Sequence, residues 1–315
     1  MAKVHLVNPM RNPAGGSEHR TIALFELIAE VADVQVWTEE EPHSAFLGQV
    51  PMRKIGPPAN FPQGGILVFV GTYFSMGGWL KAAKPSRVIL IHNLNQPDRL
   101  RQIYGALGQI ARPEVVYASE GIAKSTPEIK GVVHESPIDL NLFSPAPRPD
   151  RPFTVGRLSR DVPEKHHSGD SEIYRQLADH GIRVRLMGAE CLGISHPGIE
   201  MLPENAEPAS EFLRSLDCFF YRTAPAWREA YGRVVFEAMA CSLPVVAESR
   251  HGYAERLTDG VDYLKADDNE MALQAVLRLS KDTELKRSIG ASARSLVESI
   301  YGSEYRSSMQ EFYTR

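Results

Sequence analysis

Residues 228–247 read REAYGRVVFEAMACSLPVVA, and this stretch contains a helix pattern followed closely by a strand pattern. Gly232 is expected to open a helix that continues to Cys241, and the short apolar run Pro244–Ala247 is typical of a buried strand. A helix that leads directly into a short apolar strand is the repeating unit of a parallel sheet covered by helices. The stretch therefore predicts an α/β fold.

The same alternation extends in both directions along the chain. Strands are expected at Val4–Val7, 34–37, 66–70, 88–91, 115–117, 132–134, 153–155, 184–187 and 218–221, besides 244–247. Helices are expected at 17–32, 97–110, 171–180, 209–215, 232–241, 269–279, 284–300 and 303–312, with Ser17 as a candidate N-cap. We expect two Rossmann-like, doubly wound parallel-sheet domains facing a cleft, with ligands bound beyond the carboxyl ends of the strands.

A proline-rich segment separates the two halves of this pattern. Residues 144–152 read SPAPRPDRP, which favours a stiff, extended linker. We therefore expect an N-terminal domain over 1–145, a C-terminal domain over 152–300, and a last helix within 301–315 that packs back on the first domain.

Composition narrows the function classes. The 315 residues are 43% hydrophobic with a net charge of −4, which does not favour a nucleic-acid partner, because phosphate binding needs an excess of Lys and Arg. The three cysteines have no metal-ligand spacing, and no Asp-x-Asp metal motif occurs. The Asp267-Asp268 pair is expected to cap a helix instead. The short N-terminal apolar run is not a signal peptide, so we expect a cytoplasmic protein with at most peripheral membrane contact.

Two carboxylates stand eight positions apart in the opening stretch, Glu229 before the helix and Glu237 within it. Even on one continuous helix they would lie about 12 Å apart, whereas the carboxylate pair of a glycosidase lies about 5–9.5 Å apart. This spacing suits one carboxylate at each end of a polyhydroxylated ligand, since carboxylates accept hydrogen bonds from vicinal diols. The helix start between them, Gly232 to Val235 (with Arg233 and Val234), is expected to face phosphates.

Two cations follow the first strand of the second half, Arg157 in Gly156-Arg157-Leu158 and Lys165 eight residues later. Cations near the end of a strand can neutralise a diphosphate. A third pattern, Gly15-Gly16 between the first strand and the first helix, favours close approach of an anion to backbone N–H groups. Neither a Walker loop nor the dinucleotide fingerprint is present, which weakens the case for a dehydrogenase.

Taken together, these segments resemble the GT-B fold glycosyltransferases, specifically the retaining family 4 type. The resemblance covers nearly the whole chain and follows a constant order. The matching segments are Gly15-Gly16-Ser17-Glu18, Ser119-Glu120-Gly121, Pro137-Ile138-Asp139 through Phe143-Ser144-Pro145, Gly156-Arg157-Leu158 with Glu164-Lys165, Glu229 to Glu237 with the Ala-Met-Ala and Pro-Val-Val-Ala that follow, His251 to Glu255, and Asp259-Gly260.

The resemblance implies a role for each residue. Arg157 and Lys165 would hold the donor diphosphate, Glu229 the sugar hydroxyls and Glu237 the ribose. Gly16 would contact phosphate through its backbone, and His92 resembles the family's N-domain histidine near the donor sugar, although on its own it reads as a satisfied histidine at a strand end.

Four positions depart from the family pattern. Ser136-Pro137-Ile138-Asp139 lacks the usual Asn-Gly, His166 replaces the glycine after Lys165, Arg222-Thr223 replaces a common Pro-Ser step, and His251 replaces a glycine. The adjacent pair His166-His167 is not expected to bind metal, because adjacent histidines rarely share one ion and no further ligands are expected to cluster there.

The sequence thus predicts transfer of a hexose-type sugar from a nucleotide-diphosphate sugar to an acceptor hydroxyl, with retention and without metal or other cofactor. The acceptor is a glycan, a lipid-linked sugar or a small molecule. The alternatives are a UDP-sugar epimerase or a phosphorylase on the same fold, or a non-catalytic nucleotide-sugar-binding module.

Overall fold

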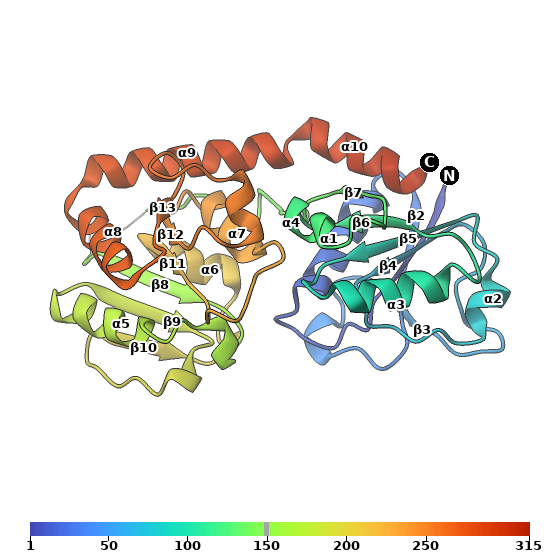
Figure 1. Ribbon diagram of the computed structural model, residues 1–315, viewed down its shortest axis with the longest axis horizontal. Helices are drawn as coiled ribbons and strands as arrows, with labels where there is room; N and C mark the ends of the chain where they lie inside the picture. Colours follow the sequence, from blue (N-terminus) through green and yellow to red (C-terminus); the bar gives the residue numbers. More distant parts are fainter. Residues whose placement is uncertain (148–150) are drawn as a thin grey trace. The chain divides into compact units, whose positions relative to one another are not determined.

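The structure is a computed structural model that describes residues 1–147 and 151–315 (Figure 1). It divides into two compact units, residues 1–137 with 302–315, and residues 138–301. The boundary between the units after Pro137 falls before residues 144–152, where a linker was expected. Residues 148–150 of that expected linker lie outside the described residues. The last residues belong to the first unit, to which the expected last helix therefore contributes.

The first unit is built on a seven-stranded parallel sheet in the order β3-β2-β1-β4-β5-β6-β7. Its strands are β1 (Lys3–Val7), β2 (Asp33–Thr38), β3 (Met52–Lys54), β4 (Ile66–Val70), β5 (Arg87–His92), β6 (Glu114–Tyr117) and β7 (Gly131–Val133). Its helices are α1 (Gly16–Ala29), η1 (Ser44–Phe46), α2 (Trp79–Ala83), α3 (Pro97–Leu107), α4 (Glu120–Lys124) and α10 (Ser303–Thr314).

Helix α10 completes the core of this first unit although it is the last element of the chain. Figure 1 shows it in red beside the N-terminus of the chain. Its side chains Met309, Phe312 and Tyr313 are buried in the same apolar cluster as residues of β1, α1 and β4. Gln310 donates a hydrogen bond of 2.9 Å to the carbonyl of Leu27, so polar contacts also join it to α1.

The second unit is built on a six-stranded parallel sheet in the order β10-β9-β8-β11-β12-β13. Its strands are β8 (Thr154–Leu158), β9 (Arg183–Met187), β10 (Ile199–Leu202), β11 (Cys218–Tyr221), β12 (Val245–Ala247) and β13 (Leu264–Lys265). Its helices are η2 (Pro163–Lys165), α5 (Asp170–Asp179), η3 (Glu190–Leu192), α6 (Ala209–Arg214), α7 (Arg233–Ala240), η4 (Gly252–Arg256), α8 (Asn269–Lys281) and α9 (Thr283–Tyr301).

The predicted fold class, two Rossmann-like parallel-sheet domains, is confirmed. Every expected strand overlaps an observed one, and the strands that were not expected, β3, β10 and β13, all lie at sheet edges. Edge strands are less buried than central ones, so they lack the continuous apolar runs by which the others were recognised. No helix within 1–147 or 151–315 has the length and apolar composition needed to cross a bilayer.

One predicted cap is wrong and another is confirmed. Helix α1 begins at Gly16 with Gly15 as its N-cap, and Ser17 instead donates a hydrogen bond to the carboxylate of Glu18 within the first turn. The Asp267-Asp268 stretch was expected to cap a helix, and Asp268 does accept a 2.7 Å hydrogen bond from the backbone N–H of Met271 at the start of α8.

Candidate functional site

In each unit the strand order reverses between two central strands, β1 and β4 in the first and β8 and β11 in the second. Ligands of such sheets bind beyond the carboxyl ends of the strands at this reversal, because the connecting helices leave there on opposite faces. In the second unit, Arg157 lies at the end of β8 and Tyr221 ends β11. The predicted phosphate-binding arginine therefore stands at the place where the topology predicts a ligand.

Arg157 is a buried cation with unused hydrogen-bonding capacity. Its side chain is fully buried, its Nη1 donates a 2.6 Å hydrogen bond to the carbonyl of Arg222, and its guanidinium carbon lies 4.6 Å from the centre of the Tyr221 ring. Its Nε and Nη2 atoms make no hydrogen bond with any residue that the structure describes. A guanidinium carries donors in a planar fork that matches phosphate oxygens, so these two nitrogens are suited to an anion.

Glu229 lies in the loop between β11 and α7 and receives three hydrogen bonds on one oxygen. Its Oε1 accepts from Lys165 Nζ, from the Tyr221 hydroxyl at 2.8 Å and from Trp227 Nε1 at 3.0 Å. The Lys165 and Glu229 side chains are each 11% exposed, and their charges form an ion pair. The structure thus brings two predicted site residues of opposite charge into direct contact.

The pKa values of this pair reflect burial and mutual attraction. Burial lowers the pKa of Lys165, although the Glu229 carboxylate opposes that shift. Burial alone would raise the pKa of Glu229, but the charge and hydrogen bonds of Lys165, with those of Tyr221 and Trp227, outweigh it and lower the pKa. Glu229 therefore remains an ionised carboxylate near neutral pH.

His251 positions the backbone of Glu229. Its Nδ1 accepts a 3.0 Å hydrogen bond from the backbone N–H of Glu229, and its Nε2 lies 3.0 Å from an oxygen of Glu248. Since Nδ1 must accept, the ring proton lies on Nε2 and is donated to Glu248. Burial favours the neutral form of Glu248, but hydrogen bonds from His251, Arg250 and the Thr223 N–H lower its pKa to about 2. The histidine that departs from the family pattern thus holds a predicted site residue in place.

The start of α7 lies beside this cluster. Gly232, its N-cap, has φ +82°, and a Cβ there would lie 2.4 Å from Cδ1 of Tyr253. Tyr253 in turn contacts the Tyr221 ring edge-to-face, and the N–H of Gly252 donates to the carbonyl of Glu229 at 3.1 Å. Gly232 is therefore required both for its left-handed backbone and for the close approach of the η4 segment.

The first turn of α7 contains the other predicted donor-binding residues. Arg233 Nε donates a 2.7 Å hydrogen bond to Glu237 Oε1 one turn later, and both side chains are mostly buried. The carboxylate assigned to ribose is thus paired with a cation in this structure. Val234 is half-buried and Val235 is buried, so a ligand at this turn would contact their backbone N–H groups rather than their side chains.

The arginine in the Arg222-Thr223 departure has a structural explanation. Arg222 is fully buried, its Nε lies 3.1 Å from Asp170 Oδ1, and it donates to the carbonyl of Asp268 and to Asn269 at 2.8 and 2.7 Å. Burial raises the pKa of Asp170 to about 6, although Arg222 and Arg157 oppose that shift. Arg222 therefore joins the starts of α5 and α8 behind the site.

In the first unit, the expected phosphate loop holds a carboxylate of its own. Glu18 accepts a 3.2 Å hydrogen bond from the Asn12 N–H and a 2.6 Å bond from Ser17 Oγ, and it is only 6% exposed. A Cβ on Gly15 would lie 2.1 Å from Glu18 Oε2, whereas a Cβ on Gly16 would meet nothing within 4 Å. Gly15 is thus needed to admit Glu18, and this negative charge opposes an anion at the loop.

His92 ends β5 in the same unit and is fully buried. Neither ring nitrogen has a hydrogen-bond partner within the described part of the chain, and burial lowers its pKa to about 4. Its ring contacts that of Tyr117 edge-to-face with 6.3 Å between centres. In this structure His92 is a neutral core side chain without access to a ligand.

A cavity of about 190 Å³ lies at the strand reversal of the first unit. Its lining comes from the carboxyl ends of β1 and β4 and from the start of α1: Asn8, Pro9, Arg11, Ser17, Glu18, Val70, Gly71 and Tyr73. The polar and aromatic groups of this cavity suit a hydroxylated ligand.

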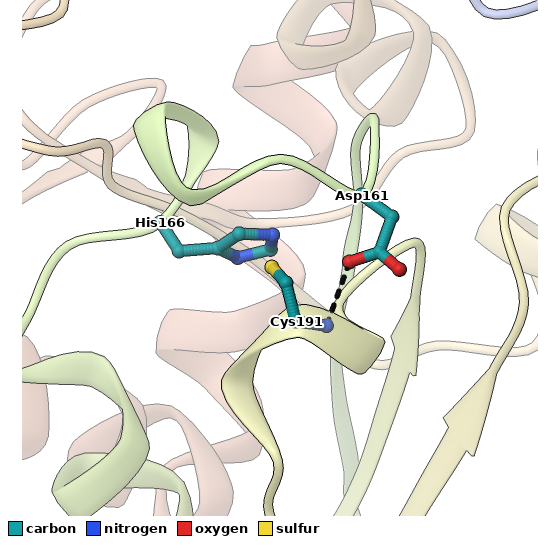
Figure 2. Close-up of side chains that lie close together, drawn as sticks. All are labelled: Asp161, His166 and Cys191. Atoms are coloured by element: carbon teal, nitrogen blue, oxygen red, sulfur yellow. Dashed lines mark hydrogen bonds between the residues drawn. The ribbon is translucent and has the colours of Figure 1, made fainter.

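Sequence reasoning did not connect three residues that lie on two loops of the second unit. The ligand atoms of Asp161, His166 and Cys191 all lie within 4.8 Å of one another (Figure 2). The expectation that no further metal ligands lie near His166 is therefore wrong, because parallel pairing of β8 and β9 brings the loops that follow them together. Sequence reasoning also missed the contacts of Tyr221, Trp227 and His251 with Glu229. Of these three residues, it had noted His251 alone, as a departure from the family pattern.

Part of the chain is similar to known glycosyltransferases. Residues 143–296 match the family described as glycosyl transferases group 1. An uncharacterized glycosyltransferase, MJ1178 of Methanocaldococcus jannaschii, is 27% identical over 128 residues, which cover 40% of this chain and 33% of that protein. The capsular polysaccharide biosynthesis glycosyltransferase CapM of Staphylococcus aureus is 22% identical over 167 residues, covering 48% of this chain and 43% of that protein. The matched part thus spans less than half the length of these relatives.

Solved structures match over nearly the whole chain. Anabaena Alr3699/HepE in complex with UDP and glucose has a TM-score of 0.76 at 15% identity, covering 99% of this chain and 98% of that one. WaaG, a glycosyltransferase involved in lipopolysaccharide biosynthesis, has a TM-score of 0.66 at 14% identity, covering 99% of both chains. These likenesses show the GT-B fold.

Proposed function

We propose that the chain transfers a hexose-type sugar from a nucleotide-diphosphate sugar to an acceptor hydroxyl, with retention and with no metal ion in the chemical step. The observation that carries the proposal is the buried cluster of Arg157, Lys165 and Glu229 at the strand reversal of the second unit. It combines positive charge for a diphosphate with a carboxylate for sugar hydroxyls.

The leaving diphosphate would bind Arg157 and Lys165. Arg157 offers two nitrogens that make no hydrogen bond with a described residue, and Lys165 would exchange its bond to Glu229 for one to a phosphate oxygen. Negative charge on the diphosphate grows as the glycosidic bond breaks, so both cations stabilise the transition state more than the bound donor.

Glu229 would bind the sugar. When Lys165 turns to the diphosphate, Tyr221 and Trp227 still hold Glu229 Oε1, and the carboxylate becomes available to donor hydroxyls. A carboxylate held by several donors with a lowered pKa is a weak nucleophile. This supports attack by the acceptor on the same face that the diphosphate leaves, rather than a covalent glycosyl-enzyme.

The remaining contacts follow from the family resemblance. Glu237 would turn from Arg233 to the ribose, and the N–H groups at the start of α7 would face phosphate. The acceptor would occupy the 190 Å³ cavity of the first unit, near Arg11 and Tyr73. Roles for Gly16 at phosphate and His92 at the donor sugar remain proposals, and both require rearrangement, because Glu18 and burial oppose them.

The donor is identified first by thermal shift with UDP-, GDP-, ADP- and dTDP-sugars, since a bound ligand raises apparent stability by mass action. The HepE relative was solved with UDP-glucose, so UDP-hexoses are the first to test. Acceptor glycans, lipid-linked sugars and small molecules are then screened for release of free nucleotide. Release that depends on the acceptor separates transfer from epimerisation and from mere binding.

The charge assignment is tested with Arg157→Ala and Lys165→Ala. Lys265→Ala is the matched control, because Lys265 lies in the same unit and its ion pair within 1–147 and 151–315 is a loose one with Asp267 at 3.9 Å. Loss of a positioned donor to developing charge costs about 10²–10³ in kcat. Wild-type kcat in both site variants refutes the assignment. A product anomer opposite to that of the donor, read by NMR, refutes retention.

A further inference from the structure

The Asp161, His166 and Cys191 side chains form a compact cluster outside the contacts used above. Asp161 lies in the loop after β8, His166 follows η2 on the same loop, and Cys191 lies in η3 after β9. Figure 2 shows Cys191 between the other two, with its sulfur beside the His166 ring. One ligand atom from each lies within 4.8 Å of the others.

His166 is the strongest sign that the cluster binds something. It is 3% exposed, and neither ring nitrogen has a hydrogen-bond partner within the described ranges. A buried polar group without a partner is destabilising, and a bound ligand would remove that cost. Burial, together with the charge of Arg157, lowers its pKa to about 4, although Asp161 and the backbone at Gly188 and Arg160 oppose that shift.

We propose that Asp161, His166 and Cys191 bind one Zn²⁺ ion, with the fourth position open to water at the exposed side of Cys191. Thiolate, imidazole and carboxylate are the ligands that zinc takes, whereas Ca²⁺ and Mg²⁺ select oxygen ligands. Bonds of about 2.0–2.3 Å in a tetrahedron place ligand atoms about 3.3–3.8 Å apart, so modest side-chain rotation from the observed spacing closes the site.

The charges of the cluster balance on binding. Zn²⁺ displaces the Cys191 thiol proton to solvent and forms a zinc–sulfur bond, and the thiolate and the Asp161 carboxylate together neutralise the ion. No oxidation or reduction occurs. Burial and the neighbouring Asp161 raise the pKa of the Cys191 thiol to about 12, so proton release makes zinc affinity increase with pH.

Asp161 is already held beside the other two residues. Its Oδ1 accepts a 2.9 Å hydrogen bond from the Cys191 N–H, which joins the two loops, and the carboxylate keeps further lone pairs for a metal. Such bonds fix the direction of a ligating carboxylate. The ion would tie the loop that carries Lys165 to the loop after β9, while touching no group assigned to the donor. The inference does not depend on the proposed function.

The test is metal binding by the full chain after treatment with a chelator. Titration with Zn²⁺ is expected to give one ion per chain, and titration with Co²⁺ is expected to give a thiolate-to-cobalt charge-transfer band. Loss of a group that merely orients a ligand costs about 10–100-fold in affinity, so Cys191→Ser should weaken Zn²⁺ binding by at least about 100-fold and abolish the band.

Two further variants keep the result interpretable. Asp161→Asn retains an acceptor for the Cys191 N–H but removes the charge, and it should also weaken Zn²⁺ binding. His180→Gln removes an exposed histidine of the same unit outside the cluster and should bind Zn²⁺ as the wild type does. A Co²⁺ spectrum without a thiolate band, or Cys191→Ser with wild-type affinity, overturns the proposal.

Discussion

Replacing Lys165 with methionine removes one partner of a buried ion pair and leaves the other, Glu229, as an isolated carboxylate. Both side chains are 11% exposed, so solvent screens the pair little. Breaking such a pair costs about 3–5 kcal/mol. The hydrogen bonds from Tyr221 and Trp227 remain, each worth about 1 kcal/mol, so we expect the lower end, about 3 kcal/mol, for Lys165→Met.

Glu229→Gln is expected to lower the free energy of unfolding by a similar amount, because Lys165 is then left without its carboxylate. The double variant leaves no buried charge unpaired, so its loss should be about 2 kcal/mol less than the sum of the two single losses. The assay is urea unfolding followed by circular dichroism and tryptophan fluorescence, with a separate transition fitted for each unit.

The pair Lys54–Glu41 supplies the control. Its side chains are 51% and 81% exposed, so Lys54→Met should change stability by less than about 1 kcal/mol. In Lys165→Met, burial is opposed only by the hydrogen bonds of Tyr221 and Trp227, so the pKa of Glu229 should rise and the loss of stability should be smaller at about pH 5 than at about pH 8. Additive single losses, or a Lys165→Met loss no larger than that of Lys54→Met, would refute the reasoning.

Three further predictions concern stability. Gly232→Ala should lower the free energy of unfolding by about 1–3 kcal/mol or more, because φ is +82° and the new Cβ would lie 2.4 Å from Tyr253. The control is Gly260→Ala, at φ +77° in open space, which should cost only the backbone strain. Equal losses of stability in urea would contradict the packing argument. Burial lowers the pKa of His92 in the folded state to about 4, below its usual value of 6.5. The unfolded chain therefore binds more protons between these values, and stability falls as the pH drops through that window. His92→Leu should remove about 3 kcal/mol of this acid loss, and an unchanged pH profile of the urea midpoint would exclude it. Met309 is 1% exposed in the core of the first unit, so Met309→Ala should lower the stability of that unit's unfolding transition by about 2–5 kcal/mol. A loss confined to the transition of the second unit would contradict the packing of α10.

Much of the fold is readable from local sequence. Central strands such as Ile66–Val70 and Cys218–Tyr221 are short apolar runs, and both occur with the predicted bounds. The edge strand β3, by contrast, reads Met-Arg-Lys and is largely exposed, so nothing in its sequence marks it as a strand. Its pairing with β2 depends on the sheet already being in place.

Less of the candidate site is readable, because its contacts join loops that are distant in sequence. Lys165 and Glu229 were both singled out, but as ligands of different parts of a substrate, and their ion pair depends on how side chains turn at the ends of β8 and β11. His251 appeared only as a missing glycine, and its role became visible from its bond to the Glu229 N–H. Cys191 carried no local signal, because only the β8–β9 pairing brings it near His166.

The placement of α10 has a consequence for the order in which the chain acquires structure during translation. The second unit is one continuous segment, residues 138–301, and all of it leaves the ribosome before α10 does. The first unit lacks Met309, Phe312 and Tyr313 until the whole second unit has been made. The core that begins first is therefore completed only after the second one, and a nascent chain stalled before α10 would carry an N-terminal unit with an uncovered apolar surface.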